Sequence, residues 1–136
     1  MEPDGRYLVI SSDCHAGASV STYRGYLEAK YLADFDAWES AFVNPYSDLI
    51  DLESRQYRRN FDSAIRQADL EADGIVGEVV FPNTIPPFFP SNTLRLADCT
   101  PEEYALRWAG VRAHNRWLAD FCSQLPGRRA GSRNSS

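Results

Sequence analysis

Residues 61–83 read FDSAIRQADLEADGIVGEVVFPN, and this stretch joins a helical pattern to a strand pattern. Its first half repeats apolar residues every three or four positions, as amphipathic helices do. Gly74 follows, at the place where a left-handed residue commonly ends a helix. The apolar run Ile75–Phe81 then predicts a buried strand. Pro82 and Asn83 directly after it are residues that end strands and form turns. The residues expected on the apolar helix face are Phe61, Ala64, Ile65, Ala68 and Ala72.

An earlier strand is predicted in Arg6–Ser12, another short apolar run with β-branched residues. We expect it to be buried on both faces and to end where small residues and Gly17 follow. A strand, a helix and a strand with a short turn between helix and second strand form a βαβ unit, whose strands pair in parallel. The sequence therefore predicts an α/β fold.

A long insertion lies between the first strand and the clear helix. In residues 20–43, aromatic and leucine side chains recur at helical spacings, so this part is expected to be helical in pieces. Residues 44–54 are predicted to be a loop. The insertion is either a lid over a site or packing material, and the sequence leaves both readings open.

A Pro-rich loop over residues 82–99 leads to a third helix with strong start signals. Thr100 is a predicted N-cap, Pro101 suits the first helical position, and Glu103 completes a capping box. Residues 127–131 resemble the lead into another strand, whereas residues 132–136 hold no apolar residue and are expected to be a polar tail. The positions expected to face the core are Tyr104, Trp108, Val111, Asn115, Leu118, Cys122 and Leu125.

The composition excludes several partners. The chain has 136 residues and a formal net charge of -5, which disfavours nucleic acid as a partner. No secretory signal is recognisable, and no apolar run approaches the roughly 20 residues of a membrane span. The 3 cysteines are odd in number and widely spaced, which fits neither a disulfide framework nor a CxxC zinc knuckle, so a cytoplasmic location is expected.

The order and spacing of four segments resemble the amidohydrolase-related enzymes, the branch that includes metal-dependent decarboxylases of the aminocarboxymuconate-semialdehyde type. The segments are residues 9–17 (VISSDCHAG), 71–83 (EADGIVGEVVFPN), 112–121 (RAHNRWLADF) and 126–131 (PGRRAG). The resemblance implies a (β/α)₈ TIM barrel, of which residues 1–131 would be an incomplete N-terminal portion with the first two strands and their helices. Since the family continues with an apolar third strand, residues 132–136 would be an unrelated tail.

Asp13 and His15 are the candidate metal ligands. They follow the first strand, and residues two apart in an extended chain point the same way, which turns Cys14 to the other side. Carboxylate oxygen and imidazole nitrogen suit Zn²⁺ and also Mn²⁺. In the family, the first barrel strand ends in such a pair. The alternative without a metal ion is that Asp13 only forms a turn at the end of the strand.

Other candidates are weaker, and no catalytic residue is assigned. Asn83 either binds substrate or only forms a turn after the second strand. His114 lies on the third helix and is interpreted as structural or solvated. Glu78, inside a strand, is expected to pair with an arginine. Three phenylalanines either wall a pocket or belong to the core, namely Phe81, Phe88 and Phe89.

The resemblance implies a metal-dependent hydrolase acting on a small-molecule amide, ester or lactone, inactive as this chain alone. Non-oxidative decarboxylation of a small aromatic or unsaturated acid is the alternative in the same family. A different class is a non-catalytic fragment that self-associates through open strand edges as a homo-oligomer. The last alternative is a small α/β domain in which the Asp-Cys-His sequence is incidental.

Overall fold

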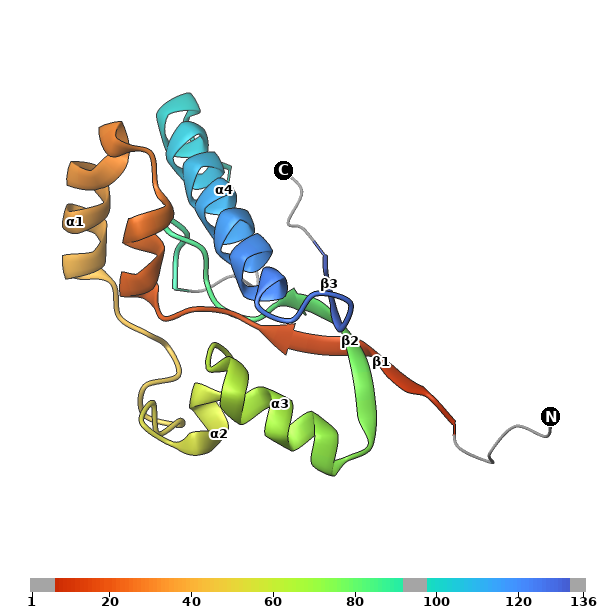
Figure 1. The fold of residues 1–136 in the computed structure, drawn as a ribbon. Helices are drawn as coiled ribbons and strands as arrows, with labels where there is room; N and C mark the ends of the chain where they lie inside the picture. Colours follow the sequence, from red (N-terminus) through yellow and green to blue (C-terminus); the bar gives the residue numbers. More distant parts are fainter. Residues whose placement is uncertain (1–6, 92–97, 133–136) are drawn as a thin grey trace.

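The computed structural model describes residues 7–91 and 98–132, which form a small α/β domain (Figure 1). Its parallel sheet has three strands in the order β1-β2-β3. The strands are β1 (Val9–Ala16), β2 (Ile75–Pro82) and β3 (Arg129–Gly131). The predicted fold class, the N-terminal portion of a TIM barrel, is therefore wrong. Barrel closure takes eight strands, whereas the described residues form an open sheet whose outer strands are β1 and β3.

The helices largely follow the sequence signals. The insertion forms two short 3₁₀ helices and one α-helix, as the prediction of helical pieces required. The helix before β2 ends at Ala72, and Gly74 follows its C-cap with a φ of 73°, in the left-handed region that glycine tolerates. The last helix begins with the complete Thr100–Glu103 capping box. The helices are η1 (Val20–Tyr26), η2 (Ala29–Tyr31), α1 (Leu32–Ala41), α2 (Arg55–Arg58), α3 (Ser63–Ala72) and α4 (Pro101–Ser123).

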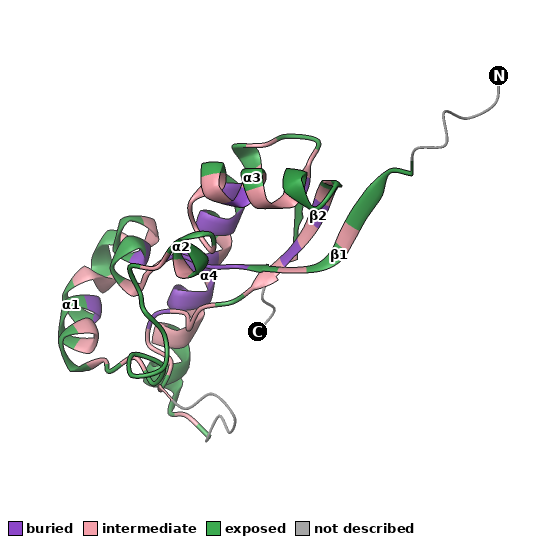
Figure 2. Cartoon of the chain, turned by 90° about the horizontal axis from the view of Figure 1, so that it is seen from below, coloured by how far each residue is buried: buried purple, intermediate pink, exposed green. Residues whose placement is uncertain are grey.

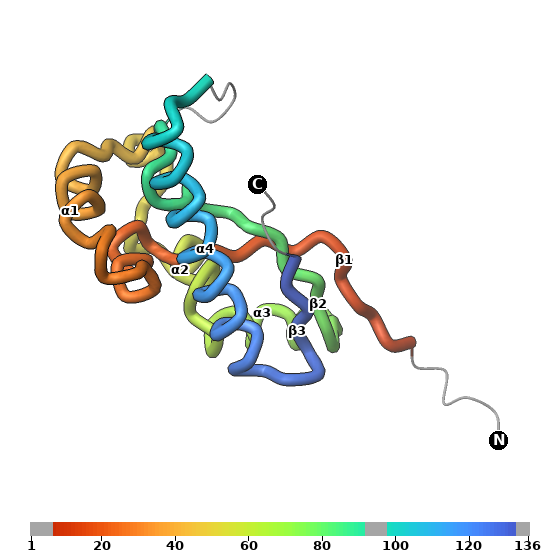
Figure 3. The backbone as a smooth tube through the Cα atoms, turned by 90° about the horizontal axis from the view of Figure 1, so that it is seen from above, coloured from red at the N-terminus to blue at the C-terminus, as the bar shows by residue number. Residues whose placement is uncertain are grey.

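β1 differs from its prediction in both position and burial. It runs from Val9 to Ala16, past the predicted last residue Ser12, and ends directly before Gly17, while the predicted first residue Arg6 lies outside the described residues. Its first half extends beyond the rest of the fold (Figures 2 and 3), and Leu8 and Ile10 are 82% and 64% exposed. β2 begins only opposite Val9, and none of the described residues forms a strand on the other side. Burial on both faces was therefore the wrong expectation.

The buried faces of α3 and α4 also differ from the predicted stripes. In α3 the buried residue is Arg66, while Ala64 and Ala68 are exposed, because Arg66 pairs with a carboxylate of β2. In α4 the predicted core position Tyr104 is 54% exposed. The buried residues of α4 are Ala109, Gly110, Val111, Ala113, His114, Trp117, Leu118 and Phe121.

The core lies between the sheet and α4. Trp117 and Phe121 stack with ring centroids 5.0 Å apart, and they pack with Ala16 of β1 and Val80 of β2. Within the described residues, no helix combines the length and the apolar character needed to cross a membrane. Of the predicted tail, Ser132 donates from its backbone N–H to Val80 O at 2.8 Å, and residues 133–136 lie outside the described residues.

Candidate functional site

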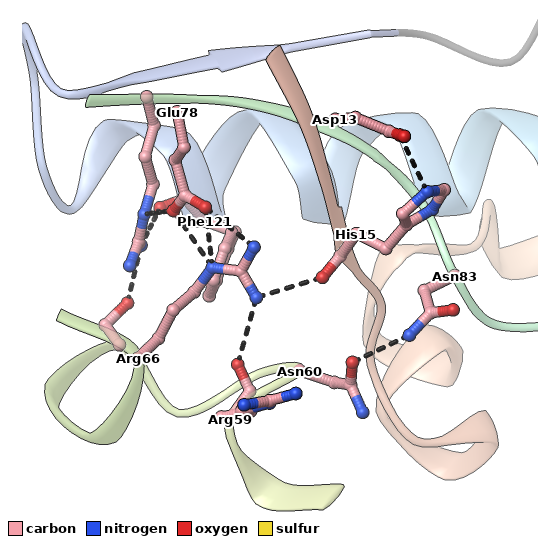
Figure 4. Close-up of polar contacts among 10 residues, drawn as sticks. Asp13, His15, Arg59, Asn60, Arg66, Glu78, Asn83 and Phe121 are labelled. Atoms are coloured by element: carbon pink, nitrogen blue, oxygen red, sulfur yellow. Dashed lines mark hydrogen bonds and ion pairs between the residues drawn. The ribbon is translucent and has the colours of Figure 1, made fainter. Parts of the chain in front are cut away.

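The carboxyl end of β1 brings Asp13 and His15 together. Asp13 Oδ1 lies 3.1 Å from His15 Nε2, and the two side chains point toward one another (Figure 4). Both are accessible, since the side chain of Asp13 is 83% exposed and that of His15 is 50% exposed. Cys14 lies on the other side of the strand, toward Glu78. The geometry expected from the alternation of an extended chain is thus present.

Two contacts to β2 hold the His15 ring in place. Its Nδ1 lies 3.2 Å from the backbone oxygen of Pro82, and its ring centroid lies 5.9 Å from that of Phe81. The register of β1 against β2 is irregular between Ser11 and Cys14. An irregularity of this kind re-aims side chains at a strand end. The imidazole is therefore oriented by the backbone of the neighbouring strand and by an aromatic ring.

The two ring nitrogens of His15 each face an oxygen atom, Nδ1 that of Pro82 and Nε2 that of Asp13. The Pro82 oxygen can only accept, so Nδ1 must carry a proton for that bond to form. The second nitrogen, Nε2, faces the Asp13 carboxylate, which is also an acceptor when it is ionised. A neutral ring has one proton and cannot satisfy both contacts. With the single proton on Nδ1, the lone pair of Nε2 faces the carboxylate and is available to a cation.

The pair alone is not a complete catalytic metal site. Within residues 7–91 and 98–132, no three His, Cys, Asp or Glu side chains gather where they would bind a metal ion. His114 is fully buried in α4, and its ring stacks on Tyr23 with centroids 5.3 Å apart. Catalytic zinc sites usually have three protein ligands and one open position. Asp13 and His15 therefore provide two of the ligands that such chemistry needs.

Asn83 lies at the same edge of the sheet, directly after β2. Its backbone N–H donates to Ala16 O at 3.0 Å, and its side-chain amide donates to Asn60 Oδ1 at 2.7 Å (Figure 4). The backbone oxygen of Asn60 accepts from the Gly17 backbone N–H at 3.1 Å, and its side-chain amide donates to Tyr57 O at 2.8 Å. The end of β1, the end of β2 and the segment before α3 are thus tied together by amide groups.

A hollow of about 310 Å³, which we call the strand-end hollow, opens beside these amides. It lies between the insertion and the residues that follow β1 and β2, and it contains Asn83 in its wall. No motif in the sequence marks Asn44, Tyr57 or Asn60 as a site residue. They reach the hollow only because the insertion folds back against the strand ends. The insertion was expected to be either a lid over a site or packing material. Its position over the hollow matches the first alternative.

The three phenylalanines that were expected to line a pocket or to belong to the core have different surroundings. Phe81 contacts His15, as described above. Phe88 packs in the core against Phe35 and Trp38, with ring centroids 6.2 and 5.8 Å apart. Phe89 lies beneath the Arg107 guanidinium, 5.9 Å from the ring centroid.

On the other side of β1, Glu78 forms a buried ionic cluster with two arginines. Arg66 Nη2 lies 2.7 Å and Arg129 Nε 2.9 Å from its carboxylate, which realises the expected pairing with arginine. Arg66 also donates from Nη1 to the backbone oxygen of His15 at 2.9 Å. The buried cluster therefore braces the strand end that carries the exposed pair.

Comparison with known proteins adds no relative. No protein-family model, no curated protein and no solved structure matches this chain. The functional argument consequently rests on the geometry of the strand end and of the strand-end hollow.

Proposed function

We propose that Asp13 and His15 bind a divalent metal ion, Zn²⁺ first and Mn²⁺ second, and that this site serves hydrolysis of a small-molecule amide, ester or lactone. The observation that carries the proposal is the 3.1 Å approach of Asp13 Oδ1 to His15 Nε2, with Nδ1 already placed against a carbonyl. The resemblance of the first strand to that of amidohydrolase-related enzymes points to the same chemistry.

The imidazole has the environment of a metal ligand. Metal-ligating histidines usually donate their second ring N–H to a carboxylate or a backbone carbonyl, which fixes the tautomer and the ring orientation. Here Pro82 O accepts from Nδ1 and leaves Nε2 for the ion. A carboxylate oxygen beside Nε2 completes a mixed N/O pair of the kind that zinc and manganese accept.

The exposure of the pair also suits this role. Because Asp13 is 83% exposed and His15 is 50% exposed, solvent and substrate can occupy the remaining coordination positions. A bound divalent ion supplies a Lewis acid that polarises a substrate carbonyl and makes water a better nucleophile. In this chain, Asp13 and His15 would hold the ion, and Pro82 would orient the imidazole. With two ligands from the described residues, binding should be weak.

The direct test is zinc titration of the ¹⁵N-labelled protein, observed through its imidazole signals. The chain has only 2 histidines, so each signal is assignable by one substitution. We expect zinc to shift the His15 signals, with Nε2 as the ligated nitrogen, and to leave those of buried His114 unchanged. His114 thus acts as a control within the same spectrum.

Two variants sharpen the test. Asp13→Asn should weaken zinc binding by at least about tenfold, which corresponds to about 1.4 kcal/mol. Asp48→Asn removes an exposed carboxylate from the loop after α1 and should leave zinc binding unchanged. Hydrolysis of p-nitrophenyl acetate should follow zinc occupancy of His15. Zinc that shifts neither His15 nitrogen, or that shifts His15 equally in the Asp13→Asn variant, would exclude the proposed site.

A further inference from the structure

We infer that the substrate of this site is an uncharged aromatic or cyclic small molecule, and that it binds in the strand-end hollow. The inference deepens the proposed function and rests on it for the link to hydrolysis. The ligand class itself follows from the hollow alone, without any metal ion.

The hollow has the size and the apolar walls of a small-ligand site. Its volume is about 310 Å³, at the lower end of the range of about 300–1,000 Å³ that is typical of such sites. Phe42, Tyr46 and Tyr57 contribute aromatic surface, and Ile50 and Ile85 contribute aliphatic surface. One aromatic ring with a short polar substituent fits this combination of size and lining.

The polar groups of the hollow are neutral. They include the amides of Asn44, Asn60 and Asn83, and no lysine, arginine, histidine, aspartate or glutamate is among the described residues that line it. The charged side chains of Asp51 and Arg59 line an adjoining hollow instead. The strand-end hollow therefore offers hydrogen bonds to a ligand but no charge.

An anionic substrate would bind poorly in such a lining. A carboxylate that loses its hydration without gaining a cationic partner costs far more free energy than a neutral amide, which needs only hydrogen bonds. Asn83 offers those, since its amide N–H donates to Asn60 while its Oδ1 accepts no hydrogen bond from the described residues. The lining therefore favours a neutral amide, ester or lactone over the carboxylic acid that a decarboxylase consumes.

The hollow and the metal pair share one edge of the sheet. Pro82 accepts the His15 Nδ1–H, and the next residue, Asn83, lines the hollow. Ala18, three residues after His15, lines it as well. The same turn of backbone thus orients the imidazole and forms a wall of the hollow.

The experiment compares benzamide with benzoate, which have nearly the same shape and differ in charge, on the metal-free protein. Binding is measured by the shifts of backbone amide signals in ¹⁵N-labelled protein. We expect benzamide to bind at least about fivefold more tightly than benzoate, with the largest shifts at Asn60, Asn83 and Thr84. Equal affinity, tighter binding of benzoate, or no saturable binding of benzamide would overturn the inference.

A charge-insertion variant tests whether the lining sets the preference. Ile50→Lys places a cation in the wall, at a residue that is 40% exposed, and should reverse the preference toward benzoate. Leu49→Lys adds the same charge at the neighbouring residue, which is 80% exposed and outside the wall of this hollow, and should leave the preference unchanged. Reversal by both lysines, or by neither, would contradict a site at this place.

The proposed metal site and the proposed ligand class can be disproved independently of one another. The double variant Asp13→Asn/His15→Gln should keep the benzamide preference in metal-free buffer, because neither residue lines the hollow. If zinc does not bind the wild-type protein while benzamide binds as expected, the metal site is wrong and the ligand class stands. If zinc binds His15 while benzamide does not bind, the ligand class is wrong and the metal site stands.

Discussion

Two carboxylates on neighbouring strands of one sheet have opposite surroundings. The side chain of Glu78 on β2 is 1% exposed and contacts the guanidinium groups of Arg66 and Arg129. That of Asp13 on β1 is 83% exposed and, within the described part of the chain, forms a hydrogen bond with the His15 ring alone. The oxygens of Glu78 are therefore used in ion pairs that stabilise the fold, whereas those of Asp13 are accessible to a ligand.

The buried carboxylate is ionised because its partners outweigh its desolvation. Burial alone would raise the pKa of Glu78, but hydrogen bonds and charge from Arg66, with further hydrogen bonds from Cys14 and Arg129, lower it. Arg129 also stacks on Phe121, with its guanidinium carbon 4.1 Å from the ring centroid. The cluster joins β2 to α3 and β3, so it links parts of the chain that are far apart in sequence.

The largest expected effect is that of Glu78→Gln. This change leaves two buried guanidinium groups without a counter-charge, and breaking a buried ion pair on one side costs about 3–5 kcal/mol. We expect the free energy of unfolding to fall by about that amount, or the variant not to fold at all. Urea unfolding followed by circular dichroism measures it.

A matched control is Glu71→Gln. Glu71 also forms a 2.7 Å ion pair with an arginine, Arg128, but both side chains are well exposed. Solvent screens such pairs, so the urea midpoint should change little. If the two variants lost similar stability, the contrast between buried and exposed carboxylates would not hold.

A smaller effect is expected from buried His114. Burial lowers its pKa to about 4, and neither ring nitrogen has a hydrogen-bond partner among the described residues. Its folded pKa lies below the unfolded value of 6.5, so between these values the unfolded state binds more protons. Stability should therefore fall as the pH drops from 6.5 to 4, by about 3 kcal/mol in total from this group.

His114→Phe removes the titration and keeps an aromatic ring beside Tyr23 and Trp117. The measurement is the slope of the unfolding free energy against pH, so a change in absolute stability from the larger ring does not affect the conclusion. We expect the variant to lose most of the slope between pH 6.5 and 4. An unchanged slope would mean that solvent reaches the His114 ring and that it is not a buried neutral group.

Local signals explain what the sequence predicted correctly. The capping box at Thr100, the left-handed Gly74 and the apolar run of β2 each depend on neighbouring residues, and each is present in the structure. The approach of Asp13 to His15 is also local, because alternation in an extended chain brings the two side chains together, while their role as metal ligands stays a prediction.

The errors come from contacts between distant residues. Arg66 is buried on a helix face that its spacing would assign to solvent, because a carboxylate 12 residues away on β2 pairs with it. In α4, His114 and Phe121 replace Tyr104 in the buried face, since the core side chains of β1 and η1 lie against its second half. The barrel prediction failed for a related reason. Open and closed parallel sheets share the βαβ unit, and only the further strands distinguish them.

The smallest expected effect on stability, and the one that most sharply tests the exposed carboxylate, belongs to Asp13→Asn. An exposed ion pair contributes little, so in metal-free buffer the free energy of unfolding should change by no more than about 1 kcal/mol. Zinc should then stabilise the two proteins to different extents. A ligand that binds only the folded state adds about 1.4 kcal/mol to the free energy of unfolding when its concentration is ten times its Kd. Wild type should gain this stability, whereas Asp13→Asn, with at least about tenfold weaker binding, should gain no more than about 0.4 kcal/mol. A large loss without metal would instead make Asp13 a structural residue like Glu78, and an equal gain with zinc would place the ion elsewhere.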